Sequence, residues 1–177
     1  MRTISALLAA TAIVTAALSG QAADRPSIPS YRGFSVGATY RDVAQRARAL
    51  QVPAVLPFVC ATARRTAQLM ECRAVIRDTT DGAAFKLAAH FVDGRAGFVS
   101  FGDSGGVDLV ARMQRELQRA LGRPTRQERG SWEWGTPRRF TRLNWRARAE
   151  ARWIYVTLTD LDVLDGIAAY VAPSREP

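Results

Sequence analysis

A serine set between an aspartate and two glycines is the feature of this sequence that most suggests catalysis. The motif occupies residues 102–106 and reads GDSGG. A serine nucleophile needs a histidine as its general base and an aspartate that orients the histidine. His90 and Asp93 precede Ser104, so the three residue types occur in the order histidine, aspartate and serine. Whether they could act together depends on their spacing and on the elements that carry them.

The motif resembles the sequence around the nucleophile of trypsin-like serine proteases, but its context differs from theirs. The three residues all fall within residues 90–104, on one predicted hairpin and its exit. Those proteases place the histidine far upstream and build two barrels, for which this chain is too short. The motif also runs into Val107, where a helix is predicted to begin, rather than into proline. We therefore reject a protease and interpret the motif as a glycine-rich turn in which Asp103 or Ser104 caps that helix.

The remaining polar residues form no catalytic or metal-binding set in the sequence. His90 is the only histidine, and no acid is placed by its spacing to orient it. Glu133 and Glu150 lie among arginines and are better suited to salt bridges than to a glycosidase pair. Three aspartates near the C-terminus lack the further ligands of an EF-hand, and we expect them to cap and charge a final helix. These aspartates are Asp160, Asp162 and Asp165. We predict no catalytic residue, no metal site and no cofactor.

The N-terminus has the order of segments found in a secretory signal peptide. A charge at Arg2 is followed by an apolar run over residues 4–18 and by small residues up to Ala23. An uncleaved membrane anchor is the alternative, but the run is shorter than the roughly 20 residues that span a bilayer. We predict that residues 1–22 are cleaved and that the protein is periplasmic or secreted. No cysteine marks a lipoprotein anchor, and no other apolar run is long enough for a transmembrane segment.

The chain has two cysteines, Cys60 and Cys72. In an oxidising compartment an even pair predicts a disulfide, which the export signal favours over two free thiols. A zinc site would need more ligands, and His90 is the only further candidate. If residues 58–62 and 70–77 pair as a hairpin centred near Thr66, the cysteines face each other and fix the register of the strands.

Arginine and tryptophan are concentrated in one part of this basic chain, which has a formal net charge of +9. Residues 112–152 hold most of the excess arginines. Aromatic residues and arginine dominate binding hot spots, so the region could bind an anionic partner; alternatively, the tryptophans fill the core and the arginines lie on the opposite, solvated face. The candidate binding face comprises Trp132, Trp134, Arg138, Arg139, Arg142, Trp145, Arg146, Arg148 and Arg152.

The order of predicted elements indicates two units with the same plan. Residues 23–32 form a flexible lead-in. A helix follows, with Thr39 as its N-cap and Asp42 as the acid three residues on, and it ends before Pro53. Strands follow, with a tight turn at residues 93–94. A second helix is predicted over 107–121, then strands at 139–146 and 151–158, then a short helix over 161–171. The units span 33–103 and 106–177.

We predict an α+β fold, an antiparallel sheet with helices on one face, in which both units share one continuous sheet. The alternative is a single domain with one larger sheet.

This plan resembles the exported α+β proteins typified by the β-lactamase-inhibitor protein, which have two tandem helix-plus-four-strand units in one curved sheet. The stapled Cys60–Cys72 hairpin is similar to a hairpin of the first inhibitor unit, and the helix start at residues 37–42 resembles that of the related outer-membrane assembly lipoproteins. The second half here lacks cysteines, and no functional residue is carried over. The resemblance implies a protein-binding scaffold.

These observations predict a non-catalytic exported protein that binds another protein of the cell envelope or outside the cell. The alternative is a module that binds an anionic envelope polymer or a lipid surface through the arginine-rich and tryptophan-rich face. Nucleic acid is a poor candidate, because the protein is predicted to be exported and has no recognition motif.

Overall fold

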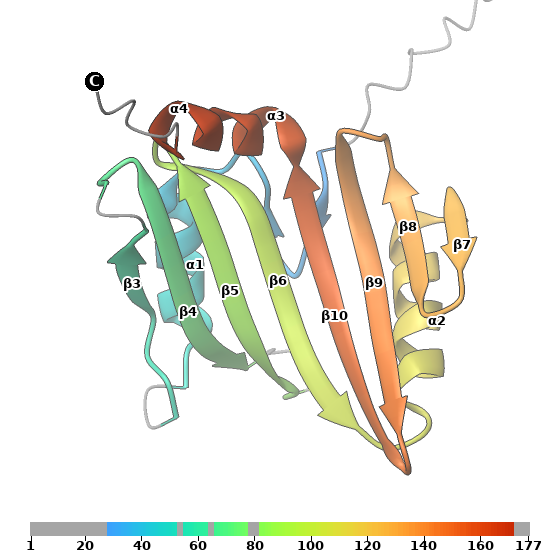
Figure 1. Ribbon diagram of the computed structural model, residues 1–177. Coiled ribbons are helices and arrows are strands. Elements are labelled where there is room, and N and C mark those ends of the chain that lie inside the picture. The colour runs from blue at the N-terminus through green and yellow to red at the C-terminus, as the bar shows by residue number, and fades with distance from the viewer. Residues whose placement is uncertain (1–27, 53–54, 64–65, 78–81, 172–177) are drawn as a thin grey trace, which may run out of the picture.

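The largest element of the structure is an eight-stranded antiparallel sheet (Figure 1). The computed structural model describes residues 28–52, 55–63, 66–77 and 82–171, so the predicted signal peptide lies outside the described residues. Among the described residues, no helix is long and apolar enough to span a membrane. The elements are β1 (Ser30–Tyr31), β2 (Phe34–Ser35), α1 (Tyr40–Leu50), β3 (Val59–Thr62), β4 (Leu69–Arg77), β5 (Ala84–Val92), β6 (Arg95–Gly105), α2 (Leu109–Leu121), β7 (Arg126–Glu128), β8 (Ser131–Gly135), β9 (Arg139–Arg148), β10 (Ala151–Asp160), α3 (Leu161–Leu164), the 3-10 helix η1 (Asp165–Ile167) and α4 (Ala168–Val171).

The strand order shows how the two halves of the chain meet. It runs β3-β4-β5-β6-β10-β9-β8-β7, and every pair is antiparallel. Each half follows one helix with four strands, and the last strands of the halves, β6 and β10, pair with each other. This pairing runs from Arg152 opposite Gly105 to Thr159 opposite Phe98. The predicted α+β fold with an antiparallel sheet is therefore confirmed, and both halves lie in one continuous sheet.

The first helix forms where its sequence signals place it. The Thr39 side chain accepts a hydrogen bond from the Asp42 backbone N–H, and the Asp42 carboxylate accepts one from the Thr39 N–H, which completes a capping box. Val43, Ala47 and Leu50 form its buried stripe. The cap and the apolar spacing thus agree on one helix with one buried face.

The start of the second helix differs from the prediction. Strand β6 continues through Gly105, and Asp108 occupies the N-cap of α2 without a side-chain cap hydrogen bond. The GDSGG motif is therefore the end of a strand, and the prediction that Asp103 or Ser104 caps the helix is wrong. Pairing with β10 holds these residues extended, because Ser104 lies opposite Trp153. The glycine-rich sequence contains no local signal for pairing with β10, so it predicts a turn rather than a strand.

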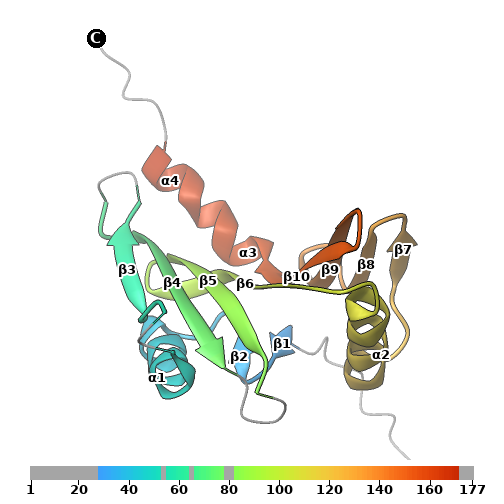
Figure 2. The same ribbon diagram turned by 90° about the horizontal axis from the view of Figure 1, so that it is seen from below.

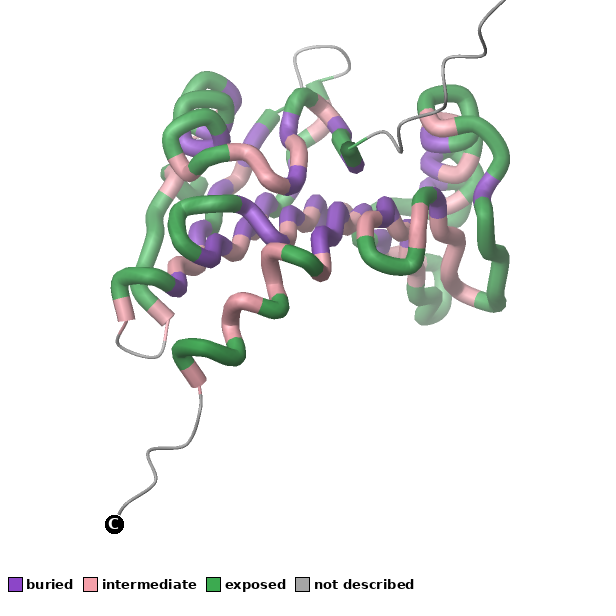
Figure 3. Tube along the Cα trace, turned by 90° about the horizontal axis from the view of Figure 1, so that it is seen from above, coloured by how far each residue is buried: buried purple, intermediate pink, exposed green. Residues whose placement is uncertain are grey.

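The two long helices, α1 and α2, cover the same side of the sheet (Figure 2). The hairpin formed by β1 and β2 lies between α1 and α2 on this side of the sheet. Figure 3 shows buried positions along the central strands and on the helix sides that face them. The short helices over residues 161–171 lie at one end of the sheet, on the side away from α1 and α2. The described residues therefore leave most of the second side uncovered.

A bulge in β6 allows the last helices to approach the sheet. The register shifts between His90 and Phe91, so that Ala96 rather than Gly97 lies opposite Phe91. Gly97 then faces the last helices, and a Cβ atom there would lie 2.6 Å from a methyl carbon of Leu164. Only glycine leaves room for that contact without displacing the helix.

A buried arginine connects the β1–β2 hairpin to both halves of the chain. The Arg32 guanidinium lies 4.0 Å from the centre of the Phe85 ring on β5, and its Nη2 lies 3.4 Å from Oε1 of Glu116 on α2. The neighbouring Tyr31 hydroxyl donates a hydrogen bond of 2.8 Å to the same Glu116 oxygen, and the Tyr31 ring packs edge-on against Phe101. The hairpin therefore joins the first half to the helix of the second.

The Tyr31 contact should make the free energy of unfolding depend on pH in the alkaline range. Burial raises the pKa of the Tyr31 phenol well above its ordinary value, so the unfolded chain loses this proton first, near pH 10. The contribution of Tyr31 is then fully present below that pH and is lost as the pH rises above it. In urea titrations we expect Tyr31→Phe to lower the free energy of unfolding by about 1 kcal/mol at neutral pH, and this difference from the wild type to shrink above pH 10. A difference that stays constant with pH would contradict the assignment.

The disulfide between Cys60 and Cys72 is formed, as predicted, and the two residues are register partners in the β3–β4 hairpin. It closes a loop with a sequence separation of 12, which should stabilise the fold by about 3 kcal/mol in the chain-entropy model. We expect replacement of both cysteines by alanine to lower the free energy of unfolding by about that amount in urea titrations. A reductant should destabilise the wild type similarly and leave the double variant unchanged. Equal stability of the two proteins would contradict this.

Candidate functional site

The uncovered side of the sheet, called the open face below, is ordered in rows by strand register. Side chains alternate across a strand, and successive pairs therefore line up residues from many strands on one side. One row crosses the sheet as Val75, Lys86, Gly102, Tyr155 and Asn144. The next row crosses it as Arg73, Ala88, Ser100, Thr157 and Arg142. The open face thus draws side chains from both halves of the chain.

Three of the predicted binding residues lie on the covered side instead. Trp132, Trp134 and Trp145 pack edge-on, with ring centres 6.1 Å and 6.4 Å apart. Trp134 is buried, and its indole N–H donates a 2.9 Å hydrogen bond to the carbonyl oxygen of Gly122 at the end of α2. Trp134 therefore fastens the end of α2 to the sheet, and Trp132 and Trp145 are half-buried against the core, as the core interpretation of the sequence expected for these three.

Two of the predicted arginines lie at the base of the last helices. Arg138 forms ion pairs with Asp162 and Asp165. Arg139 Nε lies 3.1 Å from Oδ2 of Asp160, and the buried Asp160 carboxylate also accepts hydrogen bonds from the backbone N–H groups of Asp162 and Val163 in α3. The expected capping role of the C-terminal aspartates is therefore confirmed at Asp160. These arginines hold residues 161–171 against the end of the sheet.

The other four predicted arginines occupy β9 and β10. Arg142 and Arg146 lie on the open face, because they are register partners of Thr157 and Trp153. Arg148 is exposed at the end of β9, and Arg152 donates hydrogen bonds to backbone oxygens near the β9–β10 turn. The structure therefore divides the predicted binding residues between the core, the last helices and the open face.

Trp153 and Tyr155 are absent from the predicted set, yet they are the large aromatic residues of β10 that lie on the open face. Tyr155 is 46% exposed. Ile154, Val156 and Leu158 alternate with them and are fully buried. The period-two pattern of this strand carries the signal that could have separated Trp153 from the three core tryptophans.

A groove of about 490 Å³ runs along the open face over β4, β5, β6 and β10. Small residues form its floor: Ala88, Ser100 and Gly102. The Tyr155 ring packs on Gly102, where a Cβ atom would lie 3.4 Å from the ring. Aromatic side chains of β10 form one wall, and aliphatic side chains form the other. The walls comprise Trp153 and Tyr155, and Val55, Leu56 and Val75.

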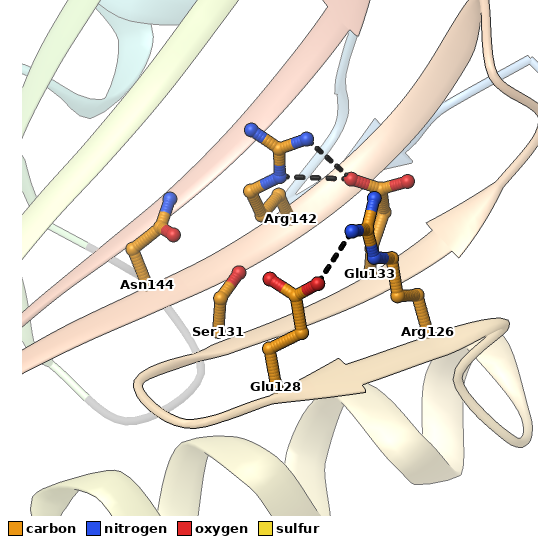
Figure 4. A pocket seen from close by; sticks show the side chains of 6 residues that line it. All are labelled: Arg126, Glu128, Ser131, Glu133, Arg142 and Asn144. Atoms are coloured by element: carbon orange, nitrogen blue, oxygen red, sulfur yellow. Dashed lines mark hydrogen bonds and ion pairs between the residues drawn. The ribbon is translucent and has the colours of Figure 1, made fainter.

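A smaller and more polar pocket of about 230 Å³ lies at the other end of the open face (Figure 4). Arg142 donates two hydrogen bonds to one oxygen of Glu133, of 2.8 Å and 2.5 Å. Arg126 forms an ion pair of 2.5 Å with Glu128 on β7. The charged groups of this pocket are therefore largely paired with one another.

The residues that suggested a nucleophile and a base are far apart. His90 lies opposite Phe98, and Ser104 lies six residues further along β6, about 20 Å away at the rise of a strand. The Asp93 carboxylate accepts a 2.6 Å hydrogen bond from Tyr170. No group of three or more potential metal ligands occurs within the part of the chain that the structure describes.

Comparisons with known protein families, with curated proteins and with solved structures found no match to this chain.

The ion pairs at the base of the last helices lower the pKa of Asp162, which can be measured. The hydrogen bond from Arg138 is the main cause that lowers the pKa of Asp162, and the charges of Arg138 and Arg139 add to it. The resulting stabilisation is present above the ordinary carboxyl pKa and is lost as the pH falls through the lowered one. We expect Arg138→Gln to raise the titration midpoint of Asp162, followed by NMR of its carboxyl carbon. Arg148→Gln is the control and should leave the midpoint unchanged; equal shifts would show that net charge rather than this contact is responsible.

Proposed function

We propose that this protein is an exported, non-catalytic binding protein that engages another protein of the cell envelope or outside the cell through its open face. The observation that carries the proposal is the contrast between the two sides of the sheet. Helices and tryptophans cover one side, whereas the other presents Trp153, an exposed Tyr155 and an apolar groove. Exposed aromatic groups beside an apolar recess are characteristic of interaction sites.

The disulfide supports the exported part of the proposal. Disulfides persist in oxidising compartments and are rare in the cytosol. The Cys60–Cys72 bond joins register partners, so it is built into the sheet. The cleavable signal over residues 1–22 remains a prediction from the sequence.

The distribution of charge favours a protein partner over an anionic polymer or lipid surface. Such a surface would require arginines gathered on one side and available to it. Instead, Arg138 and Arg139 pair with aspartates, and Arg142 pairs with Glu133. Arg146 and Arg148 make no ion pair within the described ranges. Together with Lys86 and Arg73 they are spread over β4, β5 and β9 rather than gathered in one patch, which does not favour steep electrostatic binding.

The test is capture of a protein from the envelope fraction, with the purified protein immobilised. We expect one saturable partner, identified by mass spectrometry and then purified, and about 30-fold weaker binding of that partner to the Trp153→Ala/Tyr155→Ala double variant, because two hot-spot aromatics are removed. Isothermal titration calorimetry measures the affinities.

Gln118→Ala provides the matched control, because Gln118 is exposed on α2, on the other side of the sheet. This variant should bind as the wild type does. Absence of a saturable protein partner would contradict the proposal. Capture of anionic polymer or vesicles that disappears with rising salt would support the alternative.

A further inference from the structure

The groove on the open face has the dimensions of a small-molecule site. Its volume of about 490 Å³ falls within the range of roughly 300–1,000 Å³ that is usual for ligand pockets. The floor of Ala88, Ser100 and Gly102 is flat, because these side chains are small. The aromatic wall of β10 and the aliphatic wall on the other side leave a slot suited to a chain or a flat ring.

Two cations stand on the same side of this groove. Lys86 and Arg73 belong to β5 and β4, opposite the aromatic wall, and Lys86 makes no ion pair with any residue that the structure describes. Arg73 has only a long, exposed ion pair of 3.7 Å with Glu71, the kind of pair that contributes little. Among the described residues that line the groove, the one acid is Asp103, which accepts a 2.7 Å hydrogen bond from the Ser104 backbone N–H.

We propose that the groove binds an amphipathic organic carboxylate. The apolar body lies on the small-residue floor beside Tyr155, and the carboxylate meets the ammonium of Lys86 and the guanidinium of Arg73 on the opposite side of that floor. Arginine and lysine both donate charge-assisted hydrogen bonds to carboxylates. A second copy of the chain is a poor occupant, because a two-fold contact centred on the groove would bring Lys86 and Arg73 close to their own copies and oppose like charges.

The experiment titrates the purified protein with dodecanoate, 2-naphthoate and dodecyltrimethylammonium, each below the concentration at which it forms micelles. Calorimetry gives the affinity, and the change in tryptophan fluorescence that is lost in Trp153→Phe locates the ligand. We expect saturable binding of at least one carboxylate and none of the ammonium compound. Lys86→Glu should weaken binding by about tenfold, as loss of a charge-assisted hydrogen bond implies. Ser100→Trp should abolish it by filling the floor.

Two control variants separate the groove from general effects. Arg148→Glu reverses a charge at the exposed end of β9, and Gln118→Trp adds a tryptophan on the other side of the sheet; both should bind as the wild type does. Equal binding of the ammonium compound, no binding of either carboxylate, or affinities unchanged in Lys86→Glu and in Ser100→Trp would each overturn the proposal. These ligands are tested without any protein partner, so the result is independent of the proposed protein binding.

Discussion

The antiparallel pairing of β6 with β10 is the contact on which the rest of the molecule depends. Each half supplies one helix and four strands, and four-stranded sheets with one helix each would leave an unpaired edge at β6 and at β10. Pairing these two edges satisfies their backbone groups and puts both halves in one sheet. Because the paired strands are antiparallel, the halves are related by an approximate two-fold rotation about an axis perpendicular to the sheet. That rotation preserves the two sides of the sheet, so α1 and α2 both fall on the same one.

The open face follows from this arrangement. Two helices and the β1–β2 hairpin bury one side, and Arg32 connects the hairpin to α2 through Glu116. Of the described elements, the short helices over residues 161–171 are the ones that lie on the other side, and Arg138 and Arg139 hold these at one end. The groove consequently crosses the junction of the halves, with its floor on β5 and β6 and its aromatic wall on β10. Neither half contains the site alone.

Local signals in the sequence predicted the local structure well. The capping box of Thr39 places α1, and the spacing of Cys60 and Cys72 sets a hairpin register, because both depend on neighbours in sequence. The GDSGG segment alone predicts a turn, whereas its observed extended conformation depends on β10, a strand that lies far along the chain. The division of the tryptophans and arginines between the two sides of the sheet has a related cause. Proximity in sequence does not keep side chains on one side of a strand, and the alternation around Ile154 separates Trp153 from the core tryptophans.

The edges of the sheet are less suited to binding a partner than its open face is. An unpaired edge can bind a further strand, and proteins protect edges by keeping them short or charged. Both outer strands have these features. β3 has four residues and is tied to β4 by the disulfide, and β7 has three residues, with Arg126 and Glu128 paired to each other. A partner strand would gain few backbone hydrogen bonds at either edge. The open face instead combines an exposed Tyr155 with an apolar recess and the cations Lys86 and Arg73. The proposed binding therefore relies on side chains rather than on the backbone of an edge strand.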